Sequence, residues 1–273
     1  MGGRGTSFAL WLSGAVVGIV LLIGIIAPFV GYDPVSDVDY DAQLLGPSWS
    51  HLFGTDAQGR DVAIRLLKGT EAFFLPGLLA AAIAVVGGAL AGAVAGYLEG
   101  FGRTVVLGLL QLIDTLPRLV FIILVCTILN PSITLISGVA GVLFIPAIAT
   151  VIRRKVEALA SEDYILAHVA HGFSPARILI YHILWLQCRP VLIRQATFVF
   201  GYVLFVETAL SYLGDYGVQE PAPSWGNMVA QTRDLAGQAP WPWLFPAIAI
   251  VLTISAFLSF GNLLARRDEE AIR

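Results

Sequence analysis

Three ionisable residues, Asp114, Arg118 and Glu207, lie within apolar stretches of this chain. Asp114 and Arg118 are four residues apart, which places them on one face of a helix, and they bracket Pro117. A lone charge at the centre of a membrane helix costs about 2.5–3.5 kcal/mol on insertion scales, so mutual pairing is the economical arrangement. Either the pair or Glu207 could line a polar translocation path. The alternative is a structural ion pair and a glutamate that reaches the outer interface.

The sequence offers little else for catalysis or metal binding. It contains no G-x-S-x-G, H-E-x-x-H, C-x-x-C or G-x-x-x-x-G-K-[ST] motif. His168 and His171 could touch one metal ion, but no third ligand lies nearby. We therefore expect no catalytic residue, no metal and no cofactor in this chain. Energy for uphill transport would have to come from a partner protein or from an ion gradient.

The polar stretch Ser161–Leu186 lies between two apolar runs and carries signals that start and stop helices. Its first residue can cap a helix whose positive first turn favours Glu162 and Asp163. Gly172 suits a left-handed stop, and Ser174–Pro175 can restart a helix. The pattern predicts two helices joined by a sharp turn, which would form a docking surface for a soluble partner.

Membrane helices must position these residues. Hydrophobic residues make up 57% of the chain and charged residues 13%, and the mean hydropathy is +0.81. A soluble domain has roughly 25% charged residues, and a bilayer core takes about 20 apolar residues as helix. The composition predicts an all-α polytopic membrane protein. Its six apolar runs are Phe8–Val30, Phe73–Ala95, Val105–Leu129, Ile133–Ile152, Val191–Leu213 and Trp243–Ala265.

The first run is longer than a signal peptide requires, so we interpret it as a retained span. With the N-terminus inside, 11 Lys and Arg residues lie on the inner side and 4 on the outer side. This places both termini and the Ser161–Leu186 insert in the cytoplasm, with Gly31–Glu71 and Gly214–Pro242 outside. The sequence has no basic stripe, so nucleic-acid binding has no support.

Small residues and a proline shape the predicted bundle. Ala84, Gly88, Gly92 and Gly96 recur every four residues, which favours a close approach of another helix. Pro117 removes one backbone hydrogen bond and predicts a kink in the third span. Residues 61–68 (DVAIRLLK) predict a short amphipathic helix on the outer surface.

The insert resembles the cytoplasmic coupling loop of ABC importer permeases, in the dipeptide, oligopeptide and nickel branch. That loop runs approximately E-A-A-x-x-x-G, then nine residues, then H-I-L-P. The agreeing positions are Ala167, Gly172 and His182–Leu184, and the departing positions are Leu166, His168 and Trp185.

Three other segments resemble the same branch. Residues 54–62 are similar to its external G-T-D-x-x-G-R-D-V signature. Glu207–Gly214 (ETALSYLG) is similar to E-A-A-L-S-F-L-G, and Pro223–Met228 matches P-S-W-G-N-M. The four motifs keep their order along the chain, so the resemblance covers nearly all of it.

The resemblance implies a type I importer permease fold. Residues 1–70 would form the first span and an external segment, 71–265 the permease core with the coupling loop at 153–190, and 266–273 a cytoplasmic tail. It also implies two contact surfaces. Coupling to the ATPases would involve Glu162, Asp163, Leu166, Ala167, His168 and Gly172, and contact with an external binding protein would involve Arg60, Asp61, Pro223 and Trp225.

The implied partners are a second, homologous permease, two cytoplasmic ATPases that bind ATP and Mg²⁺, and an external solute-binding protein. The chain would lie in a bacterial cytoplasmic membrane and import a peptide or a related small solute by alternating access. One rival is an ion-coupled secondary transporter using Asp114, Arg118 and Glu207, which would predict inverted repeats that we do not find. Another is a non-transporting assembly or sensor subunit.

Overall fold

The computed structural model describes residues 3–97, 99–129, 132–160, 162, 171–213 and 216–272. Within these residues the chain is helical, and its one strand-like feature is an isolated bridge between Thr55 and Asp61. The long helices are α1 (Gly3–Ile26), α3 (Phe74–Tyr97), α4 (Gly100–Asp114), α5 (Arg118–Leu129), α6 (Ile133–Ala160), α9 (Arg189–Leu213) and α11 (Trp241–Ile272). The shorter elements are α2 (Val62–Gly69), α8 (Pro175–Arg177), the π-helix η4 (Ile178–Trp185), α10 (Trp225–Thr232) and 3-10 turns at Ala27–Phe29, Tyr40–Ala42, Thr70–Ala72 and Arg233–Leu235.

The described helices confirm the predicted membrane architecture. Five are long and apolar enough to cross a bilayer, and α4 with α5 makes a sixth span if this bent pair is one span. Helices α6 and α11 each extend beyond the end of the predicted apolar run. Helix α6 continues to Ala160, and α11 continues to Ile272, so residues 266–272 are helical; their place in the cytoplasm stays a prediction.

The third predicted span is broken, not merely kinked. Helix α4 ends at Asp114, α5 begins at Arg118, and their axes differ by 75°. Pro117 has no N–H to continue the helix, and its ring disfavours helical geometry at Leu116 before it. The disruption lies at the predicted position, and the predicted kink is a break that divides the Val105–Leu129 run into two helices.

Helices α3 and α6 form the closest pair in the bundle, along the predicted ridge of small residues. Ala84 is fully buried. A Cβ atom on Gly92 would lie 2.5 Å from the carbonyl oxygen of Ala149, and one on Gly88 would lie 2.5 Å from Cβ of Ile148. The glycines thus allow the two backbones to approach, as small residues do between membrane helices. The ridge serves packing within this chain.

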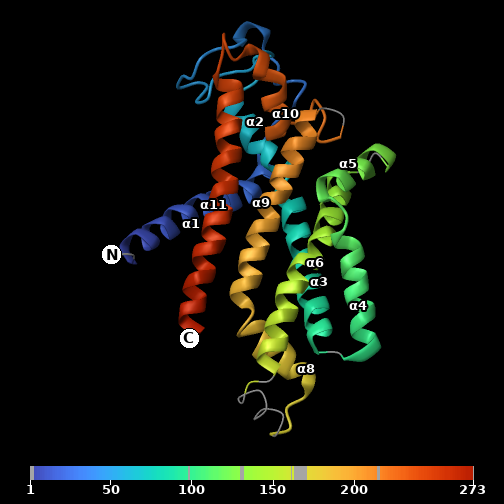
Figure 1. Ribbon diagram of the computed structural model, residues 1–273. Helices are drawn as coiled ribbons and strands as arrows, with labels where there is room; N and C mark the ends of the chain where they lie inside the picture. Colours follow the sequence, from blue (N-terminus) through green and yellow to red (C-terminus); the bar gives the residue numbers. More distant parts are fainter. Residues whose placement is uncertain are drawn as a thin grey trace.

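The bundle carries different structures at its two ends (Figure 1). At one end, residues 27–72 and 216–240 gather into what we call the loop module, which includes α2 and α10. At the opposite end lie α8 and the C-terminal end of α11. Helix α1 leans against the bundle, where Gly14 lies beside Phe260 and Gly24 beside Phe74. The described part of the insert therefore lies far from residues 54–68, as the charge distribution predicts.

Candidate functional site

The loop module is built on a tight turn at residues 54–61. Gly54 and Gly59 have φ of +73° and +74°, a conformation that favours glycine. A Cβ atom on Gly59 would lie 1.7 Å from the carbonyl oxygen of Asp39, so no side chain fits there. The Thr55 hydroxyl donates to the carbonyl of Ala42 at 2.5 Å and accepts from the amide of Leu45 at 2.8 Å. The signature residues thus fix the fold of this turn.

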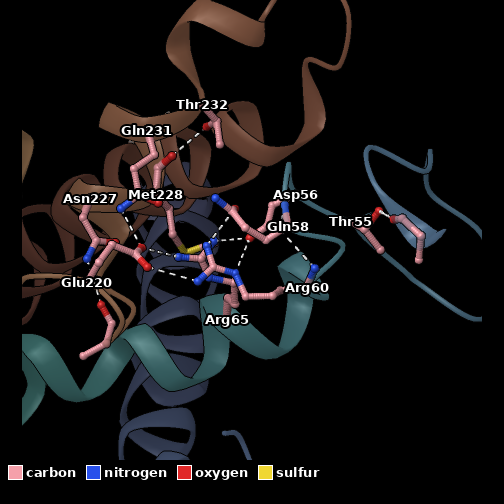
Figure 2. Close-up of polar contacts among 12 residues, drawn as sticks. Thr55, Asp56, Gln58, Arg60, Arg65, Glu220, Asn227, Met228, Gln231 and Thr232 are labelled. Atoms are coloured by element: carbon pink, nitrogen blue, oxygen red, sulfur yellow. Dashed lines mark hydrogen bonds and ion pairs between the residues drawn. The ribbon is translucent and has the colours of Figure 1, made fainter. Parts of the chain in front are cut away.

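Two buried arginines, the buried Asp56 and the half-exposed Glu220 form a cluster in the module (Figure 2). Arg60 and Arg65 are 3% and 1% exposed, and both donate to the Asp56 carboxylate, Arg60 Nε at 2.9 Å. Arg60 and Arg65 each also donate to Glu220 at 3.0 Å. Burial lowers the pKa of Arg60, but the charges of Asp56 and Glu220 outweigh this effect and raise it overall. We call Asp56, Arg60, Arg65 and Glu220 the arginine cluster.

The arginine cluster joins the two halves of the module. Asp56, Arg60 and Arg65 come from the first half, and Glu220 belongs to the second half. Gln231 of α10 also donates to Glu220, at 2.6 Å. Because charge-assisted hydrogen bonds are strong and directional, this cluster fixes how the halves meet. Sequence reasoning did not select Asp56, Arg65 or Glu220 as site residues.

Helix α2 forms where the amphipathic pattern predicts it. The Asp61 side chain caps it by accepting from the amides of Ala63 and Ile64 at 2.8 and 3.0 Å. The other carboxylate oxygen of Asp61 lies 2.9 Å from Nδ1 of His51. Asp61 is therefore an N-cap residue whose side chain is largely covered, at 16% exposure.

Helix α10 completes the module through the P-S-W-G-N-M segment. Ser224 and Asn227 form a capping box, with side-chain to backbone distances of 3.1 and 3.0 Å. Trp225 packs edge-on against Phe73 at 4.8 Å between ring centroids, and its Nε1 donates to the carbonyl of Leu66 at 2.8 Å. Capping and one buried aromatic anchor account for the residue types and spacing of this motif.

Three of the predicted contact residues are buried inside the module. Arg60 and Trp225 are each 3% exposed, and Pro223 is also buried. Their side chains offer no exposed surface to an external protein, because their partners lie inside the module. Contact between the module and a binding protein stays a prediction, in which these residues would support the surface and not form it.

Glu207 lies beneath the module and is fully buried on α9. One carboxylate oxygen accepts from the Ser211 hydroxyl at 2.7 Å, and Ser211 in turn accepts from the amide of Val218 at 2.9 Å. The Ser224 side chain lies close to the same carboxylate. Glu207 therefore joins α9 to the module. Among the described residues, no hydrogen bond or ion pair joins Glu207 to Asp114 or Arg118, and a shared translocation path for the three residues stays a prediction.

The predicted Asp114–Arg118 pair forms at the break between α4 and α5. Arg118 Nη2 lies 3.4 Å from the Asp114 carboxylate, and the two side chains are 34% and 57% exposed. Arg118 Nε also donates to the carbonyl of Leu143 at 3.2 Å, and its guanidinium lies 4.5 Å from the ring centroid of Phe144. Contacts with α6 therefore hold Arg118 more firmly than Asp114 does.

The insert is described from residue 171 onward, together with Glu162. Gly172 has φ +74°, the predicted left-handed conformation, and a helix begins at Pro175 after Ser174, as predicted. Glu162 is exposed. The other predicted coupling residues, Asp163, Leu166, Ala167 and His168, lie outside the described residues.

The end of the insert is anchored in the bundle. Ile178, Ile183 and Leu184 of its second helix belong to the main hydrophobic core. Lys155 of α6 donates to the carbonyl of Gln187 at 3.0 Å. A displacement of the exposed turn at Gly172 would therefore reach α6 and α9 through packed side chains.

Comparisons with known proteins agree with this architecture. Residues 84–269 match the family described as binding-protein-dependent transport system inner membrane component. The chain is 32% identical over 256 residues to the dipeptide transport system permease protein DppC of Alkalihalophilus pseudofirmus, covering 91% of this chain and 83% of that protein. It is 31% identical over 250 residues to the probable D,D-dipeptide transport system permease protein DdpC of Escherichia coli, covering 92% and 83%.

The oligopeptide transport system permease protein OppC of Haemophilus influenzae is 28% identical over 249 residues, covering 90% of this chain and 79% of that protein. The family match runs from Ala84 on α3 to Glu269 near the end of α11. The chain therefore belongs to the binding-protein-dependent transport system inner membrane components, as an ABC importer permease of the peptide branch.

Proposed function

We propose that this permease imports a short peptide or a related small solute by alternating access, with energy supplied by ATP hydrolysis on partner subunits. Similar proteins named for dipeptide and oligopeptide transport support the solute class. The observation that best supports this proposal is that one packed bundle carries a different structure at each of its two ends (Figure 1). A rigid loop module lies at one end, and a turn with an exposed, left-handed glycine lies at the other.

In this proposal the loop module faces outward and meets a solute-binding protein, while the insert faces the cytoplasm and docks on an ATPase. The assembly would contain a second, homologous permease, two ATPases that bind ATP and Mg²⁺, and the external binding protein. Both termini would lie in the cytoplasm of a bacterial cell, as the excess of Lys and Arg on the insert side supports. Catalysis of ATP hydrolysis would belong to the partners.

A substitution at Gly172 tests the coupling step. Its φ is +74°, and a Cβ atom there would meet nothing within 4 Å. Valine would therefore strain the backbone by roughly 1–2 kcal/mol without any steric clash, and it would reshape the turn. We expect Gly172→Val to abolish ATP-driven uptake of radiolabelled tri-alanine in proteoliposomes, with normal membrane insertion and complex assembly.

Gly100 provides a matched control, because its φ is +66° and its Cβ position is also open. It lies at the start of α4, outside the insert. Gly100→Val should leave uptake largely intact. Uptake that is unchanged in Gly172→Val, or equally reduced in both variants, would contradict the coupling role. Absence of ATP-dependent uptake in the unmodified assembly would contradict the proposed function itself.

A further inference from the structure

A cavity with a largely apolar lining and a few polar side chains opens among the membrane helices, away from the loop module. It has a volume of about 300 Å³ and lies between α5, α6, α9 and α11. Its volume is at the lower end of the range for small-molecule sites, which is about 300–1,000 Å³. The lining includes two guanidinium groups and two carboxamides, from Arg118, Arg194, Gln195 and Asn262, together with apolar side chains such as Phe198 and Leu258.

Both guanidinium groups have protein partners, and both keep N–H donors that these partners do not use. Arg118 is fixed by the Leu143 carbonyl, the Phe144 ring and a long contact of 3.4 Å to Asp114. Arg194 donates to Glu269 at 3.0 Å in a pair that is about 40% exposed on both sides. Each guanidinium carries five N–H donors, so these contacts leave several unused. Neither Asp114 nor Glu269 is among the residues that line the cavity.

A purely structural role does not account for both arginines. Arg189 already ties α9 to α11 through Asp268, with Nε and Oδ2 2.6 Å apart, and it does not line the cavity. Arg118 begins α5 at the break in the span, where an unneeded charge is costly. Intramembrane charges that face a cavity, and are only loosely paired, mark pathways for polar solutes.

The lining matches a carboxylate attached to a small apolar body. Planar guanidinium forks bind carboxylates by two parallel hydrogen bonds, and the amides of Gln195 and Asn262 can donate beside them. Phe198 and Leu258 offer the apolar wall. A lipid phosphate at the membrane interface could meet Arg194, which pairs with Glu269, but Arg118 lies at the break between α4 and α5, and one ligand must reach both. A solute that crosses the bundle therefore fits better than a lipid headgroup.

We propose that Arg118 and Arg194 bind the carboxylate of the transported solute as it crosses the bundle, so that the solute class is one with a free carboxylate, such as a peptide with an unblocked C-terminus. This inference rests on the proposed function and narrows its substrate. In this arrangement the contacts with α6 hold the Arg118 guanidinium, Asp114 is its distant partner, and the solute carboxylate accepts from its unused donors.

The test uses the intact importer in nanodiscs and two probes, tri-alanine and its C-terminal amide. Binding to the assembly without the external binding protein is measured by equilibrium dialysis at millimolar probe. We expect tri-alanine to bind about tenfold or more tighter than the amide, since hydrogen bonds to a charged group are worth about that factor. Equal binding of the two probes, or no saturable binding of tri-alanine, would overturn the proposal. Occupancy by a lipid or by a side chain of the second permease would give that result.

Substitutions localise the effect. Arg118→Gln and Arg194→Gln should each weaken tri-alanine binding by about tenfold and leave binding of the amide unchanged. The matched controls are Arg103→Gln, whose side chain is 36% exposed, and Arg189→Gln, which is 41% exposed, both outside the cavity. Equal losses in the controls would contradict the site.

If Arg118→Gln fails to assemble, Arg118→Lys keeps the charge but loses the planar fork, and it should still lower the preference for the acid over the amide. The same preparation is assayed for ATP-dependent uptake with the binding protein present. An assembly that transports but binds acid and amide alike contradicts only the cavity assignment. An assembly without ATP-dependent uptake contradicts the proposed function, whatever it binds.

Discussion

Replacing Arg65 by methionine should open the loop module while leaving the helix bundle folded. Methionine keeps much of the length and apolar bulk of the side chain but removes its charge. Arg65 is 1% exposed, and it contacts Asp56, also 1% exposed, and Glu220, which is 40% exposed. The substitution therefore removes one partner of a buried pair and one partner of a half-exposed pair.

The buried contact dominates the expected cost. Breaking a buried ion pair by removing one partner costs about 3–5 kcal/mol, because the remaining charge is left uncompensated. Asp56 keeps its contact with Arg60 at 2.9 Å, so we take the lower end, about 3 kcal/mol. The contact with the half-exposed Glu220 adds at most about 1 kcal/mol, because water screens it. If the free energy of opening the module falls by about 3 kcal/mol, the fraction of molecules with an open module rises by roughly a hundredfold.

Cleavage by thermolysin measures this opening, because proteolysis follows the open population when closing is fast. Purified protein in nanodiscs should be cut within the module roughly a hundredfold faster in Arg65→Met, and at most about fivefold faster in Glu220→Gln. Lys68→Met is the control on the same helix, since the Lys68–Glu71 pair is 20% and 38% exposed. Adding Asp56→Asn to Arg65→Met should cost less than the sum of the two single changes. Equal cleavage of Arg65→Met and Lys68→Met would refute the reasoning.

Two glycine substitutions test the close contacts of the fold. Gly59→Ala should destabilise the module by several kcal/mol, because its Cβ would lie 1.7 Å from the Asp39 carbonyl oxygen, whereas Gly31→Ala, with open space, should melt like the unmodified protein. Gly92→Leu should force α3 and α6 apart and lower the melting temperature of the solubilised protein, and Gly108→Leu, whose Cβ position is open, is the control. Equal melting temperatures within either pair would contradict the corresponding contact.

The bundle was predictable because long apolar runs admit few alternatives in a membrane. The runs gave the spans to within a few residues, except where polar residues continue α6 and α11 beyond the bilayer core. Pro117 indicated a disruption, but its 75° angle depends on packing of both half-spans against α6 and cannot be read from one proline. The spacing of Ala84 and Gly88 identified the ridge, though not which helix would pack on it.

The loop module was harder to predict because its contacts join distant parts of the chain. Its motifs pointed to a functional surface, so Arg60 and Trp225 were expected to face a partner. Their interactions with Glu220 and Leu66 span about 160 positions, which no local pattern reveals. For Glu207, the serine four residues later was a readable signal for its partner, whereas the backbone of Val218 was not.

The members of the arginine cluster are synthesised at different times. Arg65 is synthesised 155 residues before Glu220, its partner across the module. Until that carboxylate is synthesised, Asp56 is the one acidic member of the cluster, and it faces both guanidinium groups. A polypeptide that ends before residue 220 lacks the second carboxylate. Burial of both arginines with two acidic partners therefore requires translation past Glu220.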